Sequence, residues 1–271
     1  MKKGVFFCLC VFFTLSGLMA DEQKSVEDQR RDTLRYGTEN EIAELIRILR
    51  AENSESLDPE IIETAQVIKN GRILAGIFGF FAERDKGGLE EKARDILEFW
   101  DEQLPEAVRG ALDYLGQRQD TAAVEMIMAL VDDGDLRYMN NAVRALGRVG
   151  LMDQDRNGTI ADYLISYFED KMPSDDTARE IITALGSLEN PRAVSFLTGI
   201  AGNNDERSSR RITALQALSK IGDREGLGVV LETLQSSDPN VRAAAVAALG
   251  PFEGRNVDQA ILEAFRDTYY R

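Results

Sequence analysis

The residues best suited to chemistry lie in one short segment, 153–160, near the middle of the chain. Asp153, Asp155 and Asn157 would offer oxygen ligands at alternate positions, and Gly158 follows them. This is the opening spacing of a calcium loop, where ligands come from positions one, three and five and glycine at position six allows the sharp turn. The segment is therefore a candidate calcium site, of weak affinity at best.

The end of the same segment departs from the calcium pattern. The twelfth position of such a loop carries a bidentate glutamate, but this chain has Leu164 there, and Asp162 is the nearest remaining acid. An ordinary Asp/Asn/Gly turn, with Thr159 and Asp162 as a capping pair, explains the segment without a metal. Both interpretations, the calcium site and the plain turn, remain open from the sequence.

Outside this segment the sequence offers little for catalysis. The 271 residues contain no histidine and only two cysteines, Cys8 and Cys10. A Ser-His-Asp or Cys-His nucleophile and any metal site that requires histidine are therefore excluded. Because no pair of carboxylates stands out by its spacing either, we expect no catalytic residues and no cofactor other than calcium.

The charge balance restricts the partners. With 32 basic against 47 acidic residues the net charge is -15, and such a chain repels nucleic acid and anionic lipid. The content of 44% hydrophobic and 29% charged residues is typical of a folded, water-exposed protein. We therefore expect an acidic protein that does not bind nucleic acid.

The first twenty residues predict export. Lys2 and Lys3 precede an uncharged apolar stretch, as in a secretory signal peptide, and cleavage between Ala20 and Asp21 would release a periplasmic or secreted chain. Both cysteines would leave with the signal, the net charge would become -17, and no transmembrane helix would remain. Retention of the stretch as a membrane anchor is the alternative.

A short phrase recurs through the second half of the chain. It consists of Ala-Leu, two variable residues, an apolar residue, and Gly or Glu. It begins at Ala111, Ala145, Ala184, Ala217 and Ala248, with spacings of 34, 39, 33 and 31 residues. A period of this length indicates a solenoid of supersecondary units that bury their apolar faces against one another.

Each unit is predicted to be a pair of helices. In the last one, Asp238 is the expected N-cap, Pro239 the first helical residue, and Gly250-Pro251 the end of the first helix. Upstream, Thr38 and Glu41 form the pattern of a capping box. The recurring alanine favours a close crossing of neighbouring first helices, since a small side chain lets two backbones approach.

The sequence 238–250, Asp-Pro-Asn-Val-Arg through Ala-Leu-Gly, resembles the short bacterial form of the HEAT-repeat family. The resemblance implies an all-α fold, a right-handed α-solenoid of stacked antiparallel helix pairs, whose second helices line a concave, partner-binding surface. We expect a signal peptide at 1–20, an N-terminal capping helix at 21–38, degenerate helical repeats at 39–103 and HEAT-like repeats at 104–271.

Three aromatic residues are the candidates for partner binding. Tyr163 and Tyr167 stand one turn apart on a second helix, and Trp100 lies near a helix end; all three could instead edge the core. The apolar stretch 73–81 could form a lipid or peptide groove, but a helix buried between its neighbours is the better interpretation.

Four arginines recur on first helices and could bind an anion. They are Arg109, Arg144, Arg211 and Arg242. Bonds from each guanidinium to neighbouring turns are the favoured interpretation, because its planar fork suits such contacts.

The function expected from these features is an exported, non-enzymatic scaffold that binds a protein or extended peptide along its concave face. A calcium-responsive structural module with an incomplete EF-hand-like loop at 153–158 is one alternative. An enzyme is the other, because a fold does not determine function. The sequence makes no prediction of oligomeric state.

Overall fold

The computed structural model describes residues 25–150 and 158–269, and these residues form helices joined by turns, without a strand. The α-helices are α1 (Val26–Tyr36), α2 (Glu39–Glu52), α3 (Asp58–Val67), α4 (Gly71–Glu83), α5 (Glu90–Glu98), α6 (Pro105–Gln117), α7 (Val124–Asp133), α8 (Met139–Val149), α9 (Thr159–Lys171), α10 (Asp175–Ser187), α11 (Val194–Gly202), α12 (Ser208–Ile221), α13 (Leu227–Thr233), α14 (Pro239–Ala248) and α15 (Arg255–Tyr269). Short 3₁₀ helices are η1 (Trp100–Glu102), η2 (Thr121–Ala123), η3 (Pro191–Ala193) and η4 (Arg224–Gly226).

The chain separates into two compact units, which divide between Glu60 and Ile61. In the first unit, α1 packs on α2 and its Leu34 is buried. The guanidinium of Arg30 donates to both carboxylate oxygens of Glu52 at 2.8 and 2.7 Å. The predicted capping box starts α2, because Thr38 and Glu41 exchange backbone and side-chain hydrogen bonds.

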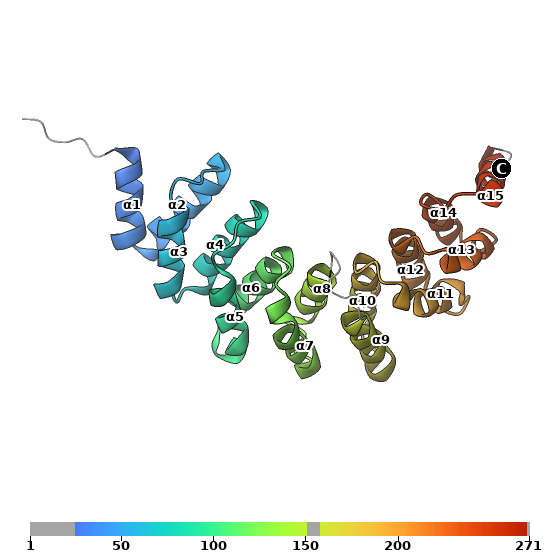
Figure 1. Cartoon of the computed structure of the whole chain (residues 1–271), viewed down its shortest axis with the longest axis horizontal. Coiled ribbons are helices and arrows are strands. Elements are labelled where there is room, and N and C mark those ends of the chain that lie inside the picture. Colours follow the sequence, from blue (N-terminus) through green and yellow to red (C-terminus); the bar gives the residue numbers. More distant parts are fainter. Residues whose placement is uncertain (1–24, 151–157, 270–271) are drawn as a thin grey trace, which may run out of the picture. The chain divides into compact units, whose positions relative to one another are not determined.

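In the second unit, α4 to α15 follow one another as successive helix pairs (Figure 1). The even-numbered first helices pack side by side in one row, which we call the inner row, and the odd-numbered second helices form the other layer. The core lies between the two layers and consists mostly of leucine, isoleucine, valine and alanine. The predicted all-helical solenoid is therefore confirmed.

The inner row corrects one expectation. Within the second unit, the even-numbered helices run along the inner side of the curve, and α5, α7, α9, α11 and α13 lie outside them (Figure 1). The first helices, rather than the second helices, therefore line the concave side.

Close glycine–alanine contacts explain why the inner row is so tight. A Cβ atom added to Gly186 on α10 would lie 2.7 Å from the Cα of Ala217 on α12, a distance that no real side chain tolerates. The same contact joins Gly116 to Ala145 and Gly147 to Ala184 in the two preceding repeats. The alanine of the recurring phrase thus packs directly against a glycine of the repeat before it, and the predicted close crossing is confirmed.

Local sequence signals start the helices where they were expected. The Asp238 carboxylate accepts from the backbone N–H of Asn240 at 2.8 Å, and Pro239 is the first residue of α14. Leu104-Pro105 likewise begins α6. These caps fix the turns between repeats, and they thereby fix the positions of the first helices whose side chains form the surface of the inner row.

The apolar stretch 73–81 belongs to the core. It forms most of α4, where Ile77, Phe78 and Phe81 are completely buried. The interpretation as a helix between neighbours is confirmed for this stretch. Among the residues that the structure describes, no helix has both the length and the apolar character needed to cross a bilayer.

Candidate functional site

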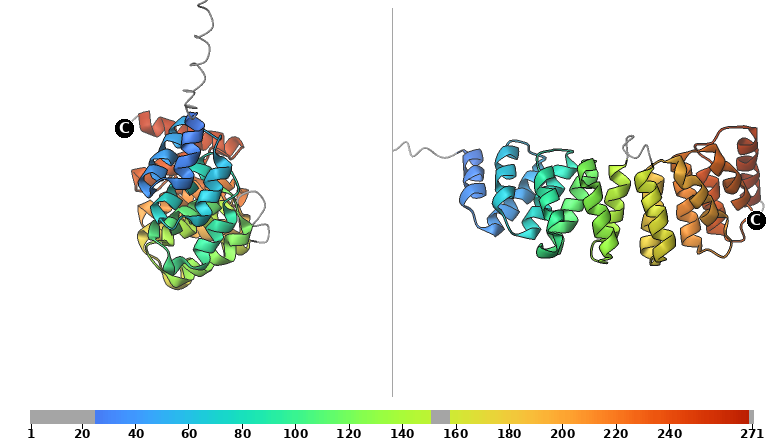
Figure 2. Two further views of the ribbon diagram at one scale, coloured as in Figure 1. Left: turned by 90° about the vertical axis from the view of Figure 1, so that its left-hand side faces the viewer. Right: turned by 60° about the horizontal axis from the view of Figure 1, so that its bottom comes forward.

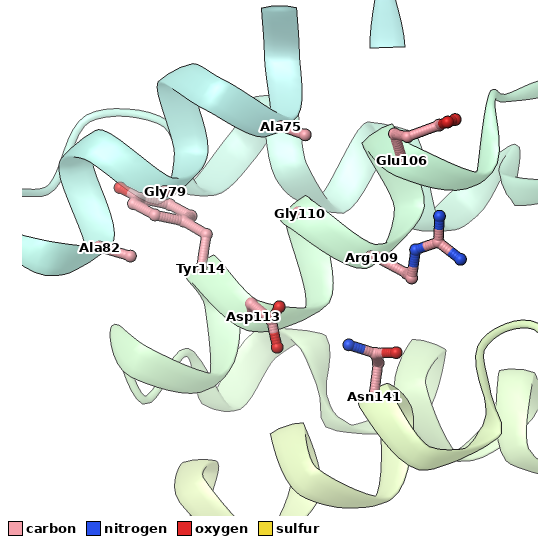
Figure 3. A pocket seen from close by; sticks show the side chains of 9 residues that line it. All are labelled: Ala75, Gly79, Ala82, Glu106, Arg109, Gly110, Asp113, Tyr114 and Asn141. Atoms are coloured by element: carbon pink, nitrogen blue, oxygen red, sulfur yellow. The ribbon is translucent and has the colours of Figure 1, made fainter. Parts of the chain in front are cut away.

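A hollow of about 310 Å³ opens on the inner row between α4, α6 and α8 (Figure 3). Helix α6 contributes most of its lining, and the full set is Ala75, Gly79, Ala82, Glu106, Arg109, Gly110, Asp113, Tyr114 and Asn141. We refer to this feature as the α6 hollow. Its residues come from three successive repeats, so it exists only because the first helices stack.

The floor of the α6 hollow is built from residues with little or no side chain. Gly110 on α6 packs against Ala75 on α4, where an added Cβ would lie 2.8 Å from the Ala75 Cα. One and two turns further along α4, Gly79 and Ala82 continue the same face. A stripe of this kind draws the backbones together and leaves an apolar space that an aliphatic chain can fill.

Tyr114 forms a rigid wall of the hollow. Its ring is completely buried and lies 5.5 Å, between centroids, from that of Phe78. The hydroxyl accepts from the backbone N–H of Leu89 at 3.2 Å and donates to the carbonyl of Lys86 at 3.1 Å. Burial raises the pKa of Tyr114 well above its ordinary value, so the phenol stays neutral and holds its position.

The rim of the α6 hollow carries charge. Glu106 is 3.9 Å from the guanidinium of Arg72, whereas Arg109 and Asp113 form no ion pair within 4.0 Å with any described residue. Figure 3 shows Glu106, Arg109 and Asp113 leaving the same helix, with Asn141 opposite them on α8. The site can therefore hold a ligand that has an aliphatic stem and a charged end.

A second hollow of about 370 Å³ lies further along the inner row, and it is polar. Its lining comes from α8, α10 and α12, and consists of Asn140, Asp176, Arg179, Glu180, Thr183, Thr213 and Gln216. Two of its acids are neutralised internally, because Arg144 donates to Glu180 at 3.0 and 3.4 Å and Arg179 pairs with Asp176 at 2.5 Å. It offers hydrogen bonds but no apolar floor.

The four recurring arginines do not form an anion-binding row. Arg144 pairs with Glu180, the buried Arg211 donates to the carbonyl of Ala201 at 3.0 Å, and Arg242 donates to the carbonyl of Ser236 at 2.7 Å. The structural interpretation therefore holds for these three. Arg109 differs, since it lines the α6 hollow and has no ion-pair partner in the described residues.

The predicted partner-binding aromatics lie away from both hollows. The Tyr163 hydroxyl is 2.9 Å from Asp132 Oδ1 and 3.0 Å from the carbonyl of Met128, and its ring is 6.3 Å from that of Tyr167. Burial, together with the bond to Asp132, raises the pKa of Tyr163. Tyr163 thus ties α9 to α7, in the outer layer.

Trp100 lies in η1, between α5 and α6. Its ring meets the Tyr138 ring edge to face at 5.7 Å between centroids. It belongs to the connections between repeats and not to the hollow. A role of these three aromatics in partner binding stays a prediction.

The predicted calcium loop falls mostly outside the described residues, which leave out Asp153, Asp155 and Asn157. The fourth candidate ligand, Asp162, is exposed on α9 and pairs with Arg192 Nη1 at 2.5 Å. Ala20 and Asp21 also lie outside the described residues. The calcium site and the signal cleavage therefore stay predictions.

Elsewhere in the described part of the chain, metal ligands do not gather. Within residues 25–150 and 158–269, no group of three or more His, Cys, Asp or Glu residues is placed to hold a metal ion. The chain has no histidine at all. The described residues therefore do not fit a metal centre built from histidine and carboxylate ligands.

Comparison with known proteins places the chain in a family. A model of the spirochaete HEAT repeat protein family matches residues 34–271. The chain belongs to this family. The predicted membership of the HEAT-repeat family is thus confirmed, and the inner row of this HEAT repeat protein consists of the first helices of its repeats.

Two similar curated proteins are named for an enzymatic activity. Deoxyhypusine hydroxylase of Debaryomyces hansenii is 26% identical over 159 residues, which are 56% of this chain and 50% of that protein. The protein of the same name from Candida albicans is 30% identical over 145 residues, or 54% of this chain and 44% of that one. The chain thus spans about half the length of the curated relatives it matches.

A solved structure of human deoxyhypusine hydroxylase in complex with glycerol is also similar. It is 14% identical with a TM-score of 0.36, and the match covers 83% of this chain and 95% of that one. This likeness is too loose to transfer the role of any residue.

The names of the curated relatives contradict the prediction of a non-enzymatic scaffold. The prediction rested on the repeat array together with the missing catalytic residue types, and neither of these excludes enzymatic activity as a whole. A HEAT-type solenoid is compatible with either role, because function depends on the residues of a site and not on the fold that carries them.

Sequence reasoning missed Glu106, Asp113 and Asn141 as site residues. They are ordinary surface residue types. Glu106 and Asp113 lie two turns apart on α6, and Asn141 joins them only through the stacking of α6 and α8. A usable signal was present on α4, where Ala75, Gly79 and Ala82 recur at helical spacing on one face.

Proposed function

We propose that this HEAT repeat protein is an enzyme that acts on an amine-bearing side chain of a protein or peptide. Support comes from the two curated relatives named deoxyhypusine hydroxylase. Deoxyhypusine is a lysine derivative, so its side chain combines an aliphatic stem with amines that are cationic at neutral pH.

The α6 hollow is the observation that carries the proposal. An aliphatic amine needs an apolar channel for its methylene groups and a carboxylate for its charged end. The small residues Ala75, Gly79 and Ala82 supply the apolar channel. Asp113, which forms no ion pair with a described residue, supplies the carboxylate. Arg109 and Asn141 on the rim can bond the main chain of the same substrate.

The described residues support recognition of the substrate and not the oxidation step. Hydroxylation by dioxygen commonly uses iron held by two histidines and a carboxylate, and this chain has no histidine. No alternative cluster of ligands is present in residues 25–150 and 158–269. We therefore assign binding and orientation of the amine to the α6 hollow and derive no chemical step there.

The test compares peptides that differ only in the amine. A labelled peptide with a deoxyhypusine or lysine side chain should bind the purified chain, and the same peptide with its amines acetylated should bind far less. Asp113→Asn should weaken binding of the amine peptide about tenfold, the effect of losing a charge-assisted hydrogen bond. Asp205→Asn, at an exposed acid outside both hollows, is the matched control.

Enzymatic action is measured separately by mass spectrometry. After aerobic incubation with the purified chain, ferrous iron and ascorbate, the deoxyhypusine peptide should gain the mass of one oxygen atom, while the two electrons of ascorbate reduce the second oxygen atom of dioxygen to water. Equal binding of the amine and acetylated peptides, with no mass change, would contradict the proposal.

A further inference from the structure

Exposed apolar side chains in the second unit concentrate at one kind of position. The large ones in the described residues are Val67, Phe99, Leu104, Leu136, Met172 and Leu262. All except Leu262 lie where a second helix ends and the next first helix begins. Four successive repeats thus place an apolar side chain at the same kind of turn, although burying it would stabilise the fold.

These turns share one edge of the solenoid. The helices of the second unit stand side by side and alternate in direction, so the connections from second to first helices all lie at the same end of the helices (Figure 2). We call the surface formed by Leu104, Leu136 and Met172 the turn edge. Their side chains are 53%, 82% and 85% exposed.

The turn of Leu136 is rigidly built. The carboxylate of Asp135 accepts from the backbone N–H of Arg137 at 2.8 Å and pairs with its guanidinium at 2.6 Å. The next residue, Tyr138, is buried and packs against Trp100. With both neighbours fixed, Leu136 is held outward in an ordered turn.

Met172 is held outward at a conformational cost. Its φ angle of 45° is left-handed, and its backbone N–H donates to the carbonyl of Phe168 at 3.2 Å as the cap of α9. This conformation costs a residue other than glycine about 1 kcal/mol. Because its backbone is strained and its side chain is exposed, Met172 contributes no stability to the fold at this position.

Exposed carboxylates lie within three residues of Leu104 and Met172 in the chain, and of the exposed cations beside the turn edge Arg137 is already paired with Asp135 while Lys171 adjoins Met172. Asp101, Glu102, Glu169 and Asp170 are exposed, and none of them forms an ion pair within 4.0 Å with a described residue. A surface with apolar centres and unpaired acids near them is complementary to a partner that presents apolar residues flanked by cations. A second copy of this acidic chain would be repelled.

We propose that the turn edge binds a basic amphipathic helix of another protein. Neighbouring repeats are about 10 Å apart, and seven residues of an α-helix rise by about 10.5 Å. Apolar residues at i, i+7 and i+14 of the partner helix would therefore meet Leu104, Leu136 and Met172 in turn. Lysine or arginine residues beside them would pair with the nearby carboxylates. This surface is separate from the α6 hollow and does not depend on the amine substrate.

The test uses a synthetic helical peptide with leucines at i, i+7 and i+14 and lysines beside them, followed by fluorescence anisotropy. A second peptide has the same composition with its leucines distributed around the helix. The first should bind the full chain, more weakly as salt is raised, and the second should bind at least about tenfold less well.

Variants of the turn edge make the test specific. Leu136→Ser and Met172→Gly should each raise Kd about fivefold, and the double variant should raise it further. Met172→Gly also relieves the left-handed backbone, so lost binding cannot be attributed to lost folding. Leu262→Ser removes another exposed apolar side chain, which lies on α15 outside the turn edge, and should leave Kd unchanged. Wild-type affinity in Leu136→Ser and Met172→Gly, or equal binding of the two peptides, would overturn the proposal.

Discussion

Gly186 on α10 lies directly against Ala217 on α12, so closely that a methyl group at 186 would be 2.7 Å from the Ala217 Cα. Two effects therefore oppose each other in Gly186→Ala. Alanine favours a helix by about 1 kcal/mol over glycine, but forcing apart two packed helices costs about 1–3 kcal/mol. We expect the second effect to prevail and the urea midpoint of unfolding to fall.

Gly199 on α11 provides the matched control for this substitution. It is also a helical glycine, but an added Cβ there meets no atom within 4 Å. Gly199→Ala should therefore raise the midpoint through helix propensity alone. If both alanine variants shift the midpoint in the same direction, close packing of the inner row does not control stability.

The residues that follow two of the first helices differ in the strain they carry. Glu189 after α10 and Gly222 after α12 both have a left-handed backbone, with φ of 51° and 65°, and each precedes a capping residue, Asn190 or Asp223. Only glycine adopts this conformation without cost. Glu189→Gly should therefore stabilise the protein by about 0.5–1 kcal/mol, after allowance for the more flexible unfolded chain.

The reverse change, Gly222→Ala, should destabilise the protein by about 1 kcal/mol. Its Cβ would meet Pro251 only at an ordinary contact distance of 3.9 Å, so the cost comes from the backbone and not from a clash. Thermal unfolding followed by circular dichroism would measure both variants. Shifts of the same sign in the two would contradict this account.

Features encoded by neighbouring residues were predictable from the sequence. Pro239 after Asp238 marked the start of α14, and Thr38 with Glu41 marked that of α2, because a cap requires only residues within one turn. The α6 hollow was not predictable in this way. Ala75, Asp113 and Asn141 are each more than twenty residues from the next, and only stacking brings them together.

The concave face was wrongly assigned to the second helices, although the sequence contained a physical signal for the first helices. The recurring alanines lie on the first helices, and glycines such as Gly147 and Gly186 approach them. Helices with small contact residues lie closer together, so their row is shorter than the row of second helices. The stack therefore curves toward the first helices. The spacing of the helices predicts this correctly, whereas the family resemblance placed the second helices on the concave side.

Tyr163 and Tyr167 offer a test of whether this aromatic pair has a structural role. The Tyr163 hydroxyl reaches Asp132 at 2.9 Å and the carbonyl of Met128, whereas the Tyr167 hydroxyl forms no hydrogen bond with a described residue. Tyr163→Phe should therefore lower the free energy of unfolding by about 1 kcal/mol, and Tyr167→Phe should leave it unchanged. Urea unfolding measures both, and equal effects would contradict a specific role for the Tyr163 hydroxyl.

Alkaline pH should loosen the wall of the α6 hollow. Burial raises the pKa of Tyr114 above its ordinary value of 10.0, so the folded chain keeps the phenolic proton at a pH where the unfolded chain has released it. The stability that follows from this difference is fully present below about pH 10 and is lost as the pH rises further. The free energy of unfolding should therefore fall as the pH increases above this value.

Tyr114→Phe separates this titration from other alkaline effects. The variant loses the hydrogen bonds to Leu89 and Lys86, and should be about 1 kcal/mol less stable at neutral pH. Above pH 10 it should lose less stability than the wild type, so the gap between the two narrows. Tyr36→Phe, at a residue that is 81% exposed, should follow the wild-type curve. A gap that stays constant in urea unfolding from neutral to alkaline pH would show that the Tyr114 phenol does not govern the alkaline response.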